Sequence, residues 1–344
     1  MNVTWSVANT TAAPVSAANV KISLSTDGGN TFPTVLTAST ANNGSATVTV
    51  PNVSTTTARI KVEAVGNIFF DISDANFTIT GNGTIPTVLA NISTRLLVGT
   101  GDNALIGGFI VTGTQDKKVL IRAIGPSLTL AGKLANPTLE LRSSAGTLLK
   151  SNDDWMNSTP ADKQAIIDSG APPTNDLESA IVAVLPANTS QYTAIVRGLN
   201  DTTGTGLVEI YDLDRTVNSK LANISTRGVV QTGDTVLIAG TIVLGPSTQK
   251  VIIRAIGPSL TIAGKLLDPT LELRDANGGL LRANDNWRIG GQEAEIIAST
   301  VPPPNDFESA LIHILPGNGA SYTAIVRGVN DTTGIAVVEV YVLN

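Results

Sequence analysis

Residues 121–128 read IRAIGPSL, and the same stretch returns at residues 253–260, an offset of 132 (253 − 121 = 132). The stretch LANISTR at residues 89–95 also returns 132 residues later. Farther along, YTAIVRG at residues 192–198 returns at residues 322–328, an offset of 130 (322 − 192 = 130). The chain therefore contains two copies of one sequence unit, and the second copy is shorter by a small loop deletion, which costs a folded domain little.

This repeat divides the chain into three predicted domains: residues 1–82, the first copy at 83–215 and the second copy at 216–344. Residues 1–82 share no repeated stretch with the two copies. Residues 81–84 and 216–219 are short and polar, which is typical of linkers. A chain of 344 residues is long enough for two or three domains of ordinary size.

The hydrophobic pattern is almost entirely that of β-strands. Residues 59–65 alternate apolar and polar side chains at period two, and residues 119–124 are rich in β-branched residues. Turn-forming residues, such as Asn-Asn-Gly at 42–44, recur at the spacing typical of β-sandwiches. Two short helical turns are predicted at residues 161–167 and 292–298, the same place in each copy. We therefore predict an all-β chain of three tandem β-sandwich domains.

Composition excludes several classes of function. The chain has 22 Lys and Arg against 28 Asp and Glu, a net charge of −6, which opposes binding to nucleic acid. It has no Cys, so disulfides, thiolate metal sites and cysteine nucleophiles are excluded. Its single histidine, His313, is too few for a multi-histidine metal centre. No apolar stretch approaches the roughly 18 residues of a membrane span.

The beginning of the chain lacks the basic and apolar regions of a signal peptide. This fits either a cytoplasmic protein or the mature or trimmed form of an exported one. Thr, Ser, Asn and Gly are abundant, Lys is sparse and there are two Met, a composition that favours the second alternative. We therefore expect a secreted bacterial protein with an extracellular or cell-surface location.

Residues 25–32 read STDGGNTF and fit the Asp-box pattern. A single box predicts a hairpin turn in which Asp27 accepts backbone amides and Phe32 anchors the next strand. The stretches at residues 3–7, 19–25, 50–53 and 58–62 make residues 1–80 resemble the immunoglobulin- or fibronectin-like accessory domain of large secreted bacterial metallopeptidases. Those domains begin with one strand more. The resemblance thus implies a trimmed chain or a strand donated by a neighbouring molecule.

Each copy carries two oxygen-rich clusters, 22 residues apart in the first copy (175 − 153 = 22), on either side of the predicted helical turn. Ca²⁺ takes six to eight oxygen ligands and tolerates irregular geometry, so each pair of clusters is a candidate calcium site. The candidate ligands are Asp153, Asp154, Asn175, Asp176 and Glu178 in the first copy and Asp285, Asn286, Asn305, Asp306 and Glu308 in the second. The alternative is structural: Asn and Asp cap the turn and form Asx-turns, while Glu178 pairs with Arg197 and Glu308 forms the equivalent pair.

The order of strand, cluster loop, NDLE at residues 175–178 and YTAIVRG resembles the prepeptidase C-terminal domain, a jelly-roll-like β-sandwich of secreted bacterial proteases. The resemblance covers residues 137–212 and 269–342. Some members of that family hold Ca²⁺ and relatives bind collagen, so it implies a calcium site or a polymer-binding role. The chain departs from the family at Glu140 and Glu272, where the family favours Asp. The whole repeat also resembles tandem repeats of very large exported bacterial proteins, which implies a surface location but no activity.

Arg122 lies on an otherwise apolar predicted strand, directly before Gly-Pro-Ser-Leu in the chain. A charge in that position needs a partner, so we predict a partly buried ion pair with Glu140 or Glu209. The equivalent Arg254 is predicted to form the same pair within the second copy.

Trp155 and Trp287 follow the first cluster of each copy, and we predict that they pack beneath the loop rather than stack on carbohydrate. His313 lies on a predicted strand, and Ala183 occupies its place in the first copy. No chemistry that the two copies share can therefore need the histidine.

These patterns predict a non-catalytic protein. No Gly-rich phosphate loop leads from a strand into a helix, and no Ser/His/Asp set recurs. The leading hypothesis is an extracellular structural or adhesive protein that self-associates into a filament or surface layer. The alternative is an accessory tail that targets a secreted peptidase to collagen or another extracellular polymer. A carbohydrate-active enzyme is a third hypothesis, supported by carboxylate pairs alone.

Overall fold

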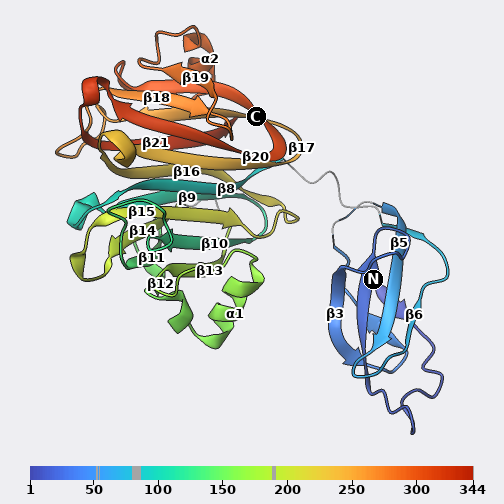
Figure 1. Cartoon of the computed structure of the whole chain (residues 1–344). Coiled ribbons are helices and arrows are strands. Elements are labelled where there is room, and N and C mark those ends of the chain that lie inside the picture. Colours follow the sequence, from blue (N-terminus) through green and yellow to red (C-terminus); the bar gives the residue numbers. More distant parts are fainter. Residues whose placement is uncertain (52, 54, 80–86, 188–190, 344) are drawn as a thin grey trace. The chain divides into compact units, whose positions relative to one another are not determined.

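The computed structural model describes residues 1–51, 53, 55–79, 87–187 and 191–343. The chain divides into two compact units, Met1–Ile85 and Pro86–Asn344. The predicted linker at residues 81–84 lies outside the described residues. Strands dominate both units, so the all-β prediction is confirmed (Figure 1).

The Met1–Ile85 unit consists of two antiparallel sheets. One sheet pairs β1 (Asn2–Thr4) with β4 (Ser45–Thr47). The other contains β3 (Thr34–Ala41), β2 (Asn19–Ser25), β5 (Thr55–Ala64) and β6 (Phe70–Ile72), with β7 (Phe77–Ile79) paired to β5. Val3 of the first sheet and Ile22, Leu24 and Ile60 of the second belong to one buried cluster. The two sheets therefore face each other across a small shared core.

The turn that follows β2 has the predicted Asp-box chemistry. Asp27 Oδ1 accepts hydrogen bonds from Ser25 Oγ at 2.6 Å and from Thr31 N at 3.0 Å. Hydrogen bonds from Ser25 and Thr31 hold the pKa of Asp27 well below its usual range. Gly28 and Gly29 have φ of +78° and +91°, which glycine adopts without a Cβ clash. The structural interpretation of this motif is confirmed.

The Pro86–Asn344 unit contains both copies of the repeat. The elements of the first copy are β8 (Val88–Val98), β9 (Leu105–Gly113), β10 (Lys117–Ile124), β11 (Pro137–Ser143), β12 (Leu148–Asn152), α1 (Pro160–Asp168), β13 (Ser179–Leu185), β14 (Gln191–Gly198) and β15 (Gly204–Asp212). Those of the second copy are β16 (Ser219–Val230), β17 (Leu237–Ile256), β18 (Pro269–Arg274), β19 (Leu280–Asn284), α2 (Glu293–Ala298), β20 (Ser309–Gly328) and β21 (Gly334–Leu343). Both predicted helical turns are confirmed, as α1 and α2.

These strands form two layers. In one layer the order is β13, β10, β15, β8, the first half of β17, the second half of β20, β18 and β19. In the other layer the order is β12, β11, β14, β9, β16, β21, the second half of β17 and the first half of β20. Each of β17 and β20 therefore runs from one layer into the other. Period-two alternation points every second side chain of each layer into one core between them.

The two copies are joined along both layers. β16 of the second copy pairs with β9 of the first, and β8 of the first copy pairs with β17 of the second. The two pairings have the same register. Thr226 lies opposite Gly107 in one pairing, and in the other their equivalents, Thr94 and Ala239, lie opposite each other (226 − 94 = 132; 239 − 107 = 132). The copies are therefore related by an approximate twofold axis. Figure 1 shows β9 of the first copy and β16 of the second copy near the middle of this unit, where they pair.

The sequence predicts a separate sandwich for each copy, whereas the structure joins the copies through shared layers. One buried cluster contains Leu89 and Phe109 of the first copy together with Val230 and Val243 of the second. The physical reason lies in β8 and β9, each of which has a strand edge that its own copy leaves unpaired. Unpaired edges expose backbone donors and acceptors, and the other copy provides the missing partner strands.

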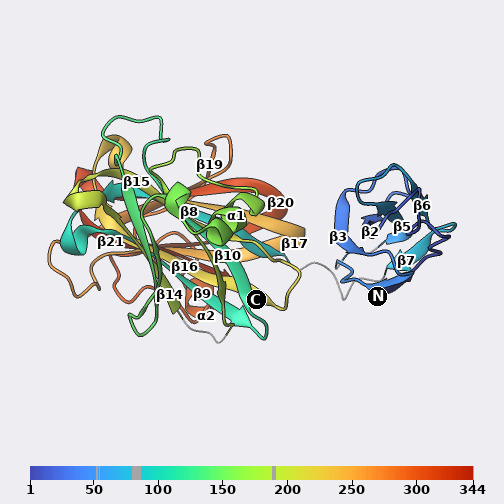
Figure 2. The same cartoon turned by 90° about the horizontal axis from the view of Figure 1, so that it is seen from below.

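The remaining elements close the two ends of this unit. We call the end formed by β12, β13 and α1 the first outer end, and the end formed by β19, the first half of β20 and α2 the second outer end. In Figure 2 the first outer end faces the viewer, with α1 in front of the strands. Ile166 of α1 packs with the buried Trp155, and Ile296 of α2 packs with the buried Trp287. The predicted packing of both tryptophans is confirmed.

Candidate functional site

The two oxygen-rich clusters of each copy lie close together, as predicted. Trp155 N donates to the backbone oxygen of Glu178 at 2.9 Å, and Trp155 Nε1 donates to the backbone oxygen of Asn175 at 3.1 Å. Trp287 forms the same two bonds with Glu308 and Asn305 at the same distances. Backbone hydrogen bonds through the tryptophan therefore join the two loops in both copies.

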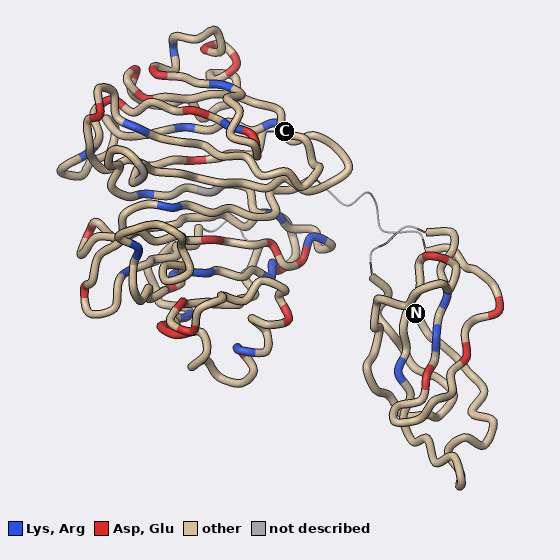
Figure 3. The backbone as a smooth tube through the Cα atoms, viewed as in Figure 1, with Lys and Arg blue, Asp and Glu red and all other residues tan. Residues whose placement is uncertain are grey.

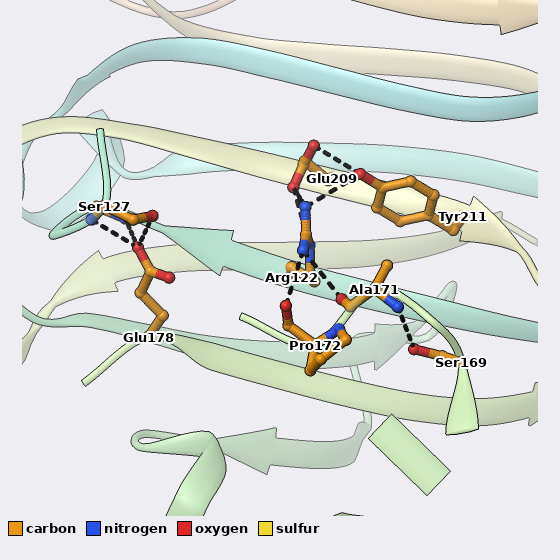
Figure 4. Close-up of polar contacts among 9 residues, drawn as sticks. Arg122, Ser127, Ser169, Ala171, Pro172, Glu178, Glu209 and Tyr211 are labelled. Carbon is orange, nitrogen blue, oxygen red and sulfur yellow. Dashed lines mark hydrogen bonds and ion pairs between the residues drawn. The ribbon is translucent and has the colours of Figure 1, made fainter. Parts of the chain in front are cut away.

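The carboxylate of Glu178, however, leaves the loops. Its Oε1 accepts hydrogen bonds from Gly125 N at 3.2 Å, Ser127 N at 2.9 Å and Ser127 Oγ at 2.5 Å (Figure 4). Glu308 forms the equivalent bonds in the second copy. Both side chains are completely buried. Their role is to fix the Gly-Pro-Ser turn that follows β10 or β17, since buried N–H groups need acceptors.

The predicted ion pairs of these glutamates are wrong. Arg197 lies 3.5 Å from Glu140 instead of Glu178, and Arg327 lies 3.5 Å from Glu272 instead of Glu308. The reason is topological. Arg197 lies on β14 beside β11, which carries Glu140, whereas Glu178 reaches into the turn after β10.

Most of the other candidate calcium ligands have local partners or face solvent, whereas Asn286 Oδ1 is buried and has no hydrogen-bond partner among the described residues. Asn175 Oδ1 accepts from Leu177 N, and Asn305 Oδ1 accepts from Phe307 N, both at 3.0 Å, which are the Asx-turns of the structural alternative. Asp154 accepts from Asn136 and Asn157, Asp306 pairs with Arg288, and Asn286 donates to Asp285. Asp153 and Asp176 are exposed. Burial, and then the neighbouring Asp154, raise the pKa of Asp153.

These contacts do not assemble a metal centre. Within residues 1–51, 53, 55–79, 87–187 and 191–343, no group of three or more His, Cys, Asp or Glu side chains is placed to hold a metal ion. The one carboxylate of each cluster that is fully buried, that of Glu178 or Glu308, is turned toward backbone amides. The predicted calcium site, which also uses asparagine oxygens, stays a prediction for a melting experiment.

Arg122 lies at the centre of a polar set between β10 and β15 (Figure 4). Its Nε donates to Glu209 Oε2 at 2.9 Å, a second guanidinium nitrogen contacts the same oxygen, and a third donates to the backbone oxygen of Ala171 at 2.9 Å. Tyr211 OH donates to Glu209 Oε1 at 2.9 Å. The predicted pair is thus confirmed with Glu209 as the partner, and Arg254 forms the equivalent set with Glu339.

The arginine also positions the segment after α1, because its bond to Ala171 ties that segment to the sheet. Its charge lies over the Tyr211 ring, 5.2 Å from the ring centroid. Desolvation by burial, followed by the charge of Glu209, raises the pKa of Tyr211 to about 12. The set is a structural brace that uses all its polar atoms internally.

A second buried ion pair was not predicted from the sequence. Lys117 Nζ lies 3.1 Å from Asp212 Oδ1 and 3.0 Å from Asp212 Oδ2, and both side chains have no exposed surface. Lys117 precedes Val119 by two positions on β10, so period two places it on the inner face. The position of Lys117 in the period-two alternation of β10 is the sequence signal that could have predicted its burial. His313, by contrast, lies on β20 opposite Val251, and its predicted strand position is confirmed.

The outer ends present free strand edges. Among the described residues, β12 pairs with β11 alone and β13 with β10 alone, while β19 pairs with β18 alone. An apolar groove of about 530 Å³ runs along β12 and β13, lined in part by Leu149, Val184 and Tyr192. A free edge beside an apolar groove is a surface on which a further strand can pair.

The same apolar positions are exposed at both outer ends. The equivalent pairs are Leu148 and Leu280, Leu149 and Leu281, Ile167 and Ile297, Leu177 and Phe307, and Val184 and Ile314. Two of these pairs differ in residue type, yet both members are apolar. Substitution between the copies has therefore left the apolar character of these positions in place.

Positively and negatively charged residues are interspersed along the described parts of each unit (Figure 3). No helix in the part of the chain that the structure describes is both long and apolar enough to cross a membrane. The longer of the two α-helices, α1, has 9 residues.

Comparison with known proteins yields no family. No family model matches the chain, and no curated protein matches it. Similar solved structures include the STIV MCP (13% identity, 75% of this chain and 94% of that chain, TM-score 0.20). They also include PNGF-II (11% identity, 90% and 74%, TM-score 0.21) and a DUF4785 family protein from Legionella pneumophila (7% identity, 73% and 83%, TM-score 0.20). No inference about this chain rests on likenesses of this size.

Proposed function

We propose that this chain is a non-catalytic extracellular structural or adhesive protein that associates with further copies of itself through its two outer ends. One observation carries the proposal: both outer ends combine free strand edges with exposed apolar side chains at equivalent positions. Soluble proteins normally protect a free edge with charge, proline or a bulge, because an apolar edge recruits other strands. β12 and β19 carry one such charge each, Lys150 and Arg282, and a register shift where they pair. Apolar side chains nevertheless stay exposed at both ends, which supports assembly.

The occupant we assign to these edges is a second copy of the chain. Inside the Pro86–Asn344 unit, edges of the same two layers already pair one copy of the repeat with the other. That internal contact is twofold and closed, so it cannot add a third copy. The outer edges continue the same two layers and remain available. A chain with two such ends can join neighbours on both sides and extend into a filament or layer.

The use of the recurring polar residues also supports a non-catalytic role. Arg122 and Glu209 bond to each other, and Glu178 bonds to the turn after β10. Each of these side chains has an equivalent that does the same in the second copy. Polar groups that bond to each other in this way stabilise the fold. We therefore assign the function of the chain to contacts made by its surface.

The family resemblances belong to this proposal. An immunoglobulin- or fibronectin-like unit at residues 1–82 and prepeptidase C-terminal-like repeats would both suit a protein that is exported. The same resemblances suggest the alternative, an accessory tail that binds collagen or another polymer for a secreted peptidase. That alternative requires a chain that stays monomeric and binds the polymer.

Sedimentation velocity over a range of concentrations tests the proposal. Val184, 61% exposed on β13, and Ile314, 56% exposed on β20, are equivalent positions on the two outer ends. We expect the wild type to form species larger than the monomer and the variant V184K/I314K to remain monomeric, because a lysine on an edge strand opposes pairing. V35K, which places the same charge on an exposed position of β3 in the other unit, is the matched control and should associate like the wild type.

The single variants separate two modes of contact. If like ends meet, V184K stops at dimers joined by the second outer ends. If unlike ends meet, V184K is monomeric. A wild type that is monomeric at every concentration contradicts the proposal, and monodisperse particles that bind collagen or polysaccharide would favour the accessory-tail alternative.

A further inference from the structure

Lys117 and Asp212 lie on core-facing positions of two adjacent strands. On β10, Lys117 shares its face with the buried Val119 and Ile121, and on β15, Asp212 shares its face with the buried Ile210. The strands pair directly, with Val119 opposite Asp212. The strand positions therefore direct both charged side chains into the apolar interior, although charged groups are more stable in water.

The fold does not require this pair of charges. In the second copy Gln249 takes the place of Lys117 (117 + 132 = 249) and Val342 takes the place of Asp212 (212 + 130 = 342). β17 and β21 nevertheless pair in the same register there, with Val251 opposite Val342. Burying an ion pair costs desolvation energy that a neutral or apolar pair avoids, so the charges call for another explanation.

We infer that Lys117 and Asp212 are a cross-linking site, at which the folded chain forms an amide bond between Lys117 Nζ and Asp212 Cγ. Nζ already lies 3.0 Å and 3.1 Å from the two carboxylate oxygens, in a site without exposed surface. The fold holds the two reacting groups in contact, so the reaction takes place within one molecule. The entropy cost of bringing two groups together from solution, which is a large part of the barrier to such reactions, is therefore avoided.

The bond-forming step balances without any other reactant. A proton first passes from the Lys117 ammonium to the Asp212 carboxylate, which gives a neutral amine and a neutral carboxylic acid. Desolvation by burial raises the pKa of Asp212, and this favours its neutral form. The nitrogen lone pair then attacks Cγ. A C–N bond forms, one C–O bond breaks, and the departing oxygen leaves with two protons as one water molecule.

Backbone groups of Asp214 are placed to assist this step. Asp214 N donates to Asp212 Oδ1 at 3.0 Å, where negative charge develops when Cγ becomes tetrahedral. The backbone oxygen of Asp214 accepts from Lys117 Nζ at 2.6 Å and so orients the amine. Both groups belong to the segment in which the chain leaves β15 for the second copy.

The amide would covalently close the first copy at this exit. Lys117 and Asp212 are 95 residues apart in sequence, so the bond closes a long loop in a chain that has no cysteine. A cross-link of that span restricts the unfolded chain and raises stability, as a disulfide does in oxidised proteins. This inference is independent of the association through the outer ends.

The intact mass of the purified, folded chain tests the cross-link. We expect the wild type to be lighter than its sequence by the mass of one water molecule. Complete tryptic digestion should leave a branched peptide in which residues 96–118 are joined to residues 198–215. The variant K117Q/D212V carries the residues of the second copy at both positions, so it should fold, and its mass should equal that of its sequence.

K118A, at the exposed lysine next to Lys117, is the matched control and should keep the mass deficit. The inference is overturned if the folded wild type has the full mass of its sequence. It is overturned equally if K117Q/D212V shows the same deficit, because the lost water would then come from another site.

Discussion

The hydroxyl groups of Thr94 and Thr226 lie 2.8 Å apart in the buried centre of the Pro86–Asn344 unit, and the two residues occupy the same place in the two copies (226 − 94 = 132). Thr94 lies on β8 in one layer, and Thr226 lies on β16 in the other. A residue that contacts its own equivalent marks the approximate twofold axis. The copies therefore form a closed pair, and any larger assembly has to use the outer ends.

Replacing both of these threonines should cost less stability than the sum of the two single replacements. In T226V the hydroxyl of Thr94 loses its partner inside the core, which costs about 1–2 kcal/mol of the free energy of unfolding. In T94V/T226V neither hydroxyl remains, so the loss should be smaller than the sum of the two single variants. Urea unfolding of the four proteins measures this coupling. Additive losses would mean that the two hydroxyls do not interact.

The contact between the copies is asymmetric at one pair of equivalent residues. Leu96 of the first copy corresponds to Gly228 of the second (96 + 132 = 228), and a Cβ on Gly228 would lie 2.4 Å from Leu96 Cδ1. Both residues are buried. We expect G228A to destabilise this unit by about 1–3 kcal/mol through overpacking.

A compensating variant identifies the cause of that loss. L96A removes the atoms that the new methyl group meets, so L96A/G228A should be less destabilised than the sum of the two single variants predicts. Thermal unfolding by calorimetry supplies the comparison. If the double variant is as unstable as that sum, then Leu96 is not the residue that requires glycine at 228.

The pH dependence of stability should report on Tyr211. Its pKa is raised to about 12 in the folded chain, whereas an unfolded tyrosine ionises near about 10. Between these values the unfolded chain releases a proton that the folded chain keeps. The contribution of Tyr211 is therefore fully present below about pH 10 and is lost as the pH rises toward about 12.

The variant Y211F cannot ionise, so its stability should fall less steeply over that range of pH. Unfolding midpoints in urea on the two sides of about pH 10 provide the measurement. Equal slopes for Y211F and the wild type would contradict the raised pKa of Tyr211.

Calcium removal should leave the melting temperature of the chain unchanged. The carboxylates of Glu178 and Glu308 bond to backbone amides, and the side chains of Asn175 and Asn305 form Asx-turns. These hydrogen bonds compete with a cation for Glu178 Oε1, Glu308 Oε1 and the two asparagine oxygens, and among the described residues Glu178 Oε2 has no donor. Melting curves in EGTA and in excess Ca²⁺ at neutral pH should coincide. A higher melting temperature in Ca²⁺ would restore the calcium site that the sequence predicts.

Local features of this chain could be predicted because the signals are local. The strands follow from period-two alternation, α1 and α2 from their equal position in the copies, and the turn at Asp27 from its own side-chain chemistry. The burial of Trp155 follows from its size, and the pairing of Arg122 from the cost of an isolated charge on an apolar strand.

Contacts between distant strands could not be predicted in the same way. The alternation of β8 is the same whether its neighbour belongs to its own copy or to the other one, so the joined layers leave no trace in the pattern. Glu178 was assigned to the loops because it follows Asn175 closely in sequence. In the structure the carboxylate of Glu178 instead accepts a hydrogen bond from Ser127 N, in the turn that follows β10. Sequence distance was a poor guide to that contact.

Electron microscopy of the purified chain, at a concentration where sedimentation detects association, tests the central claim most directly. The account predicts ordered polymers of the wild type that disappear in V184K/I314K and persist in V35K. Images of separate, uniform particles in all three samples would contradict it.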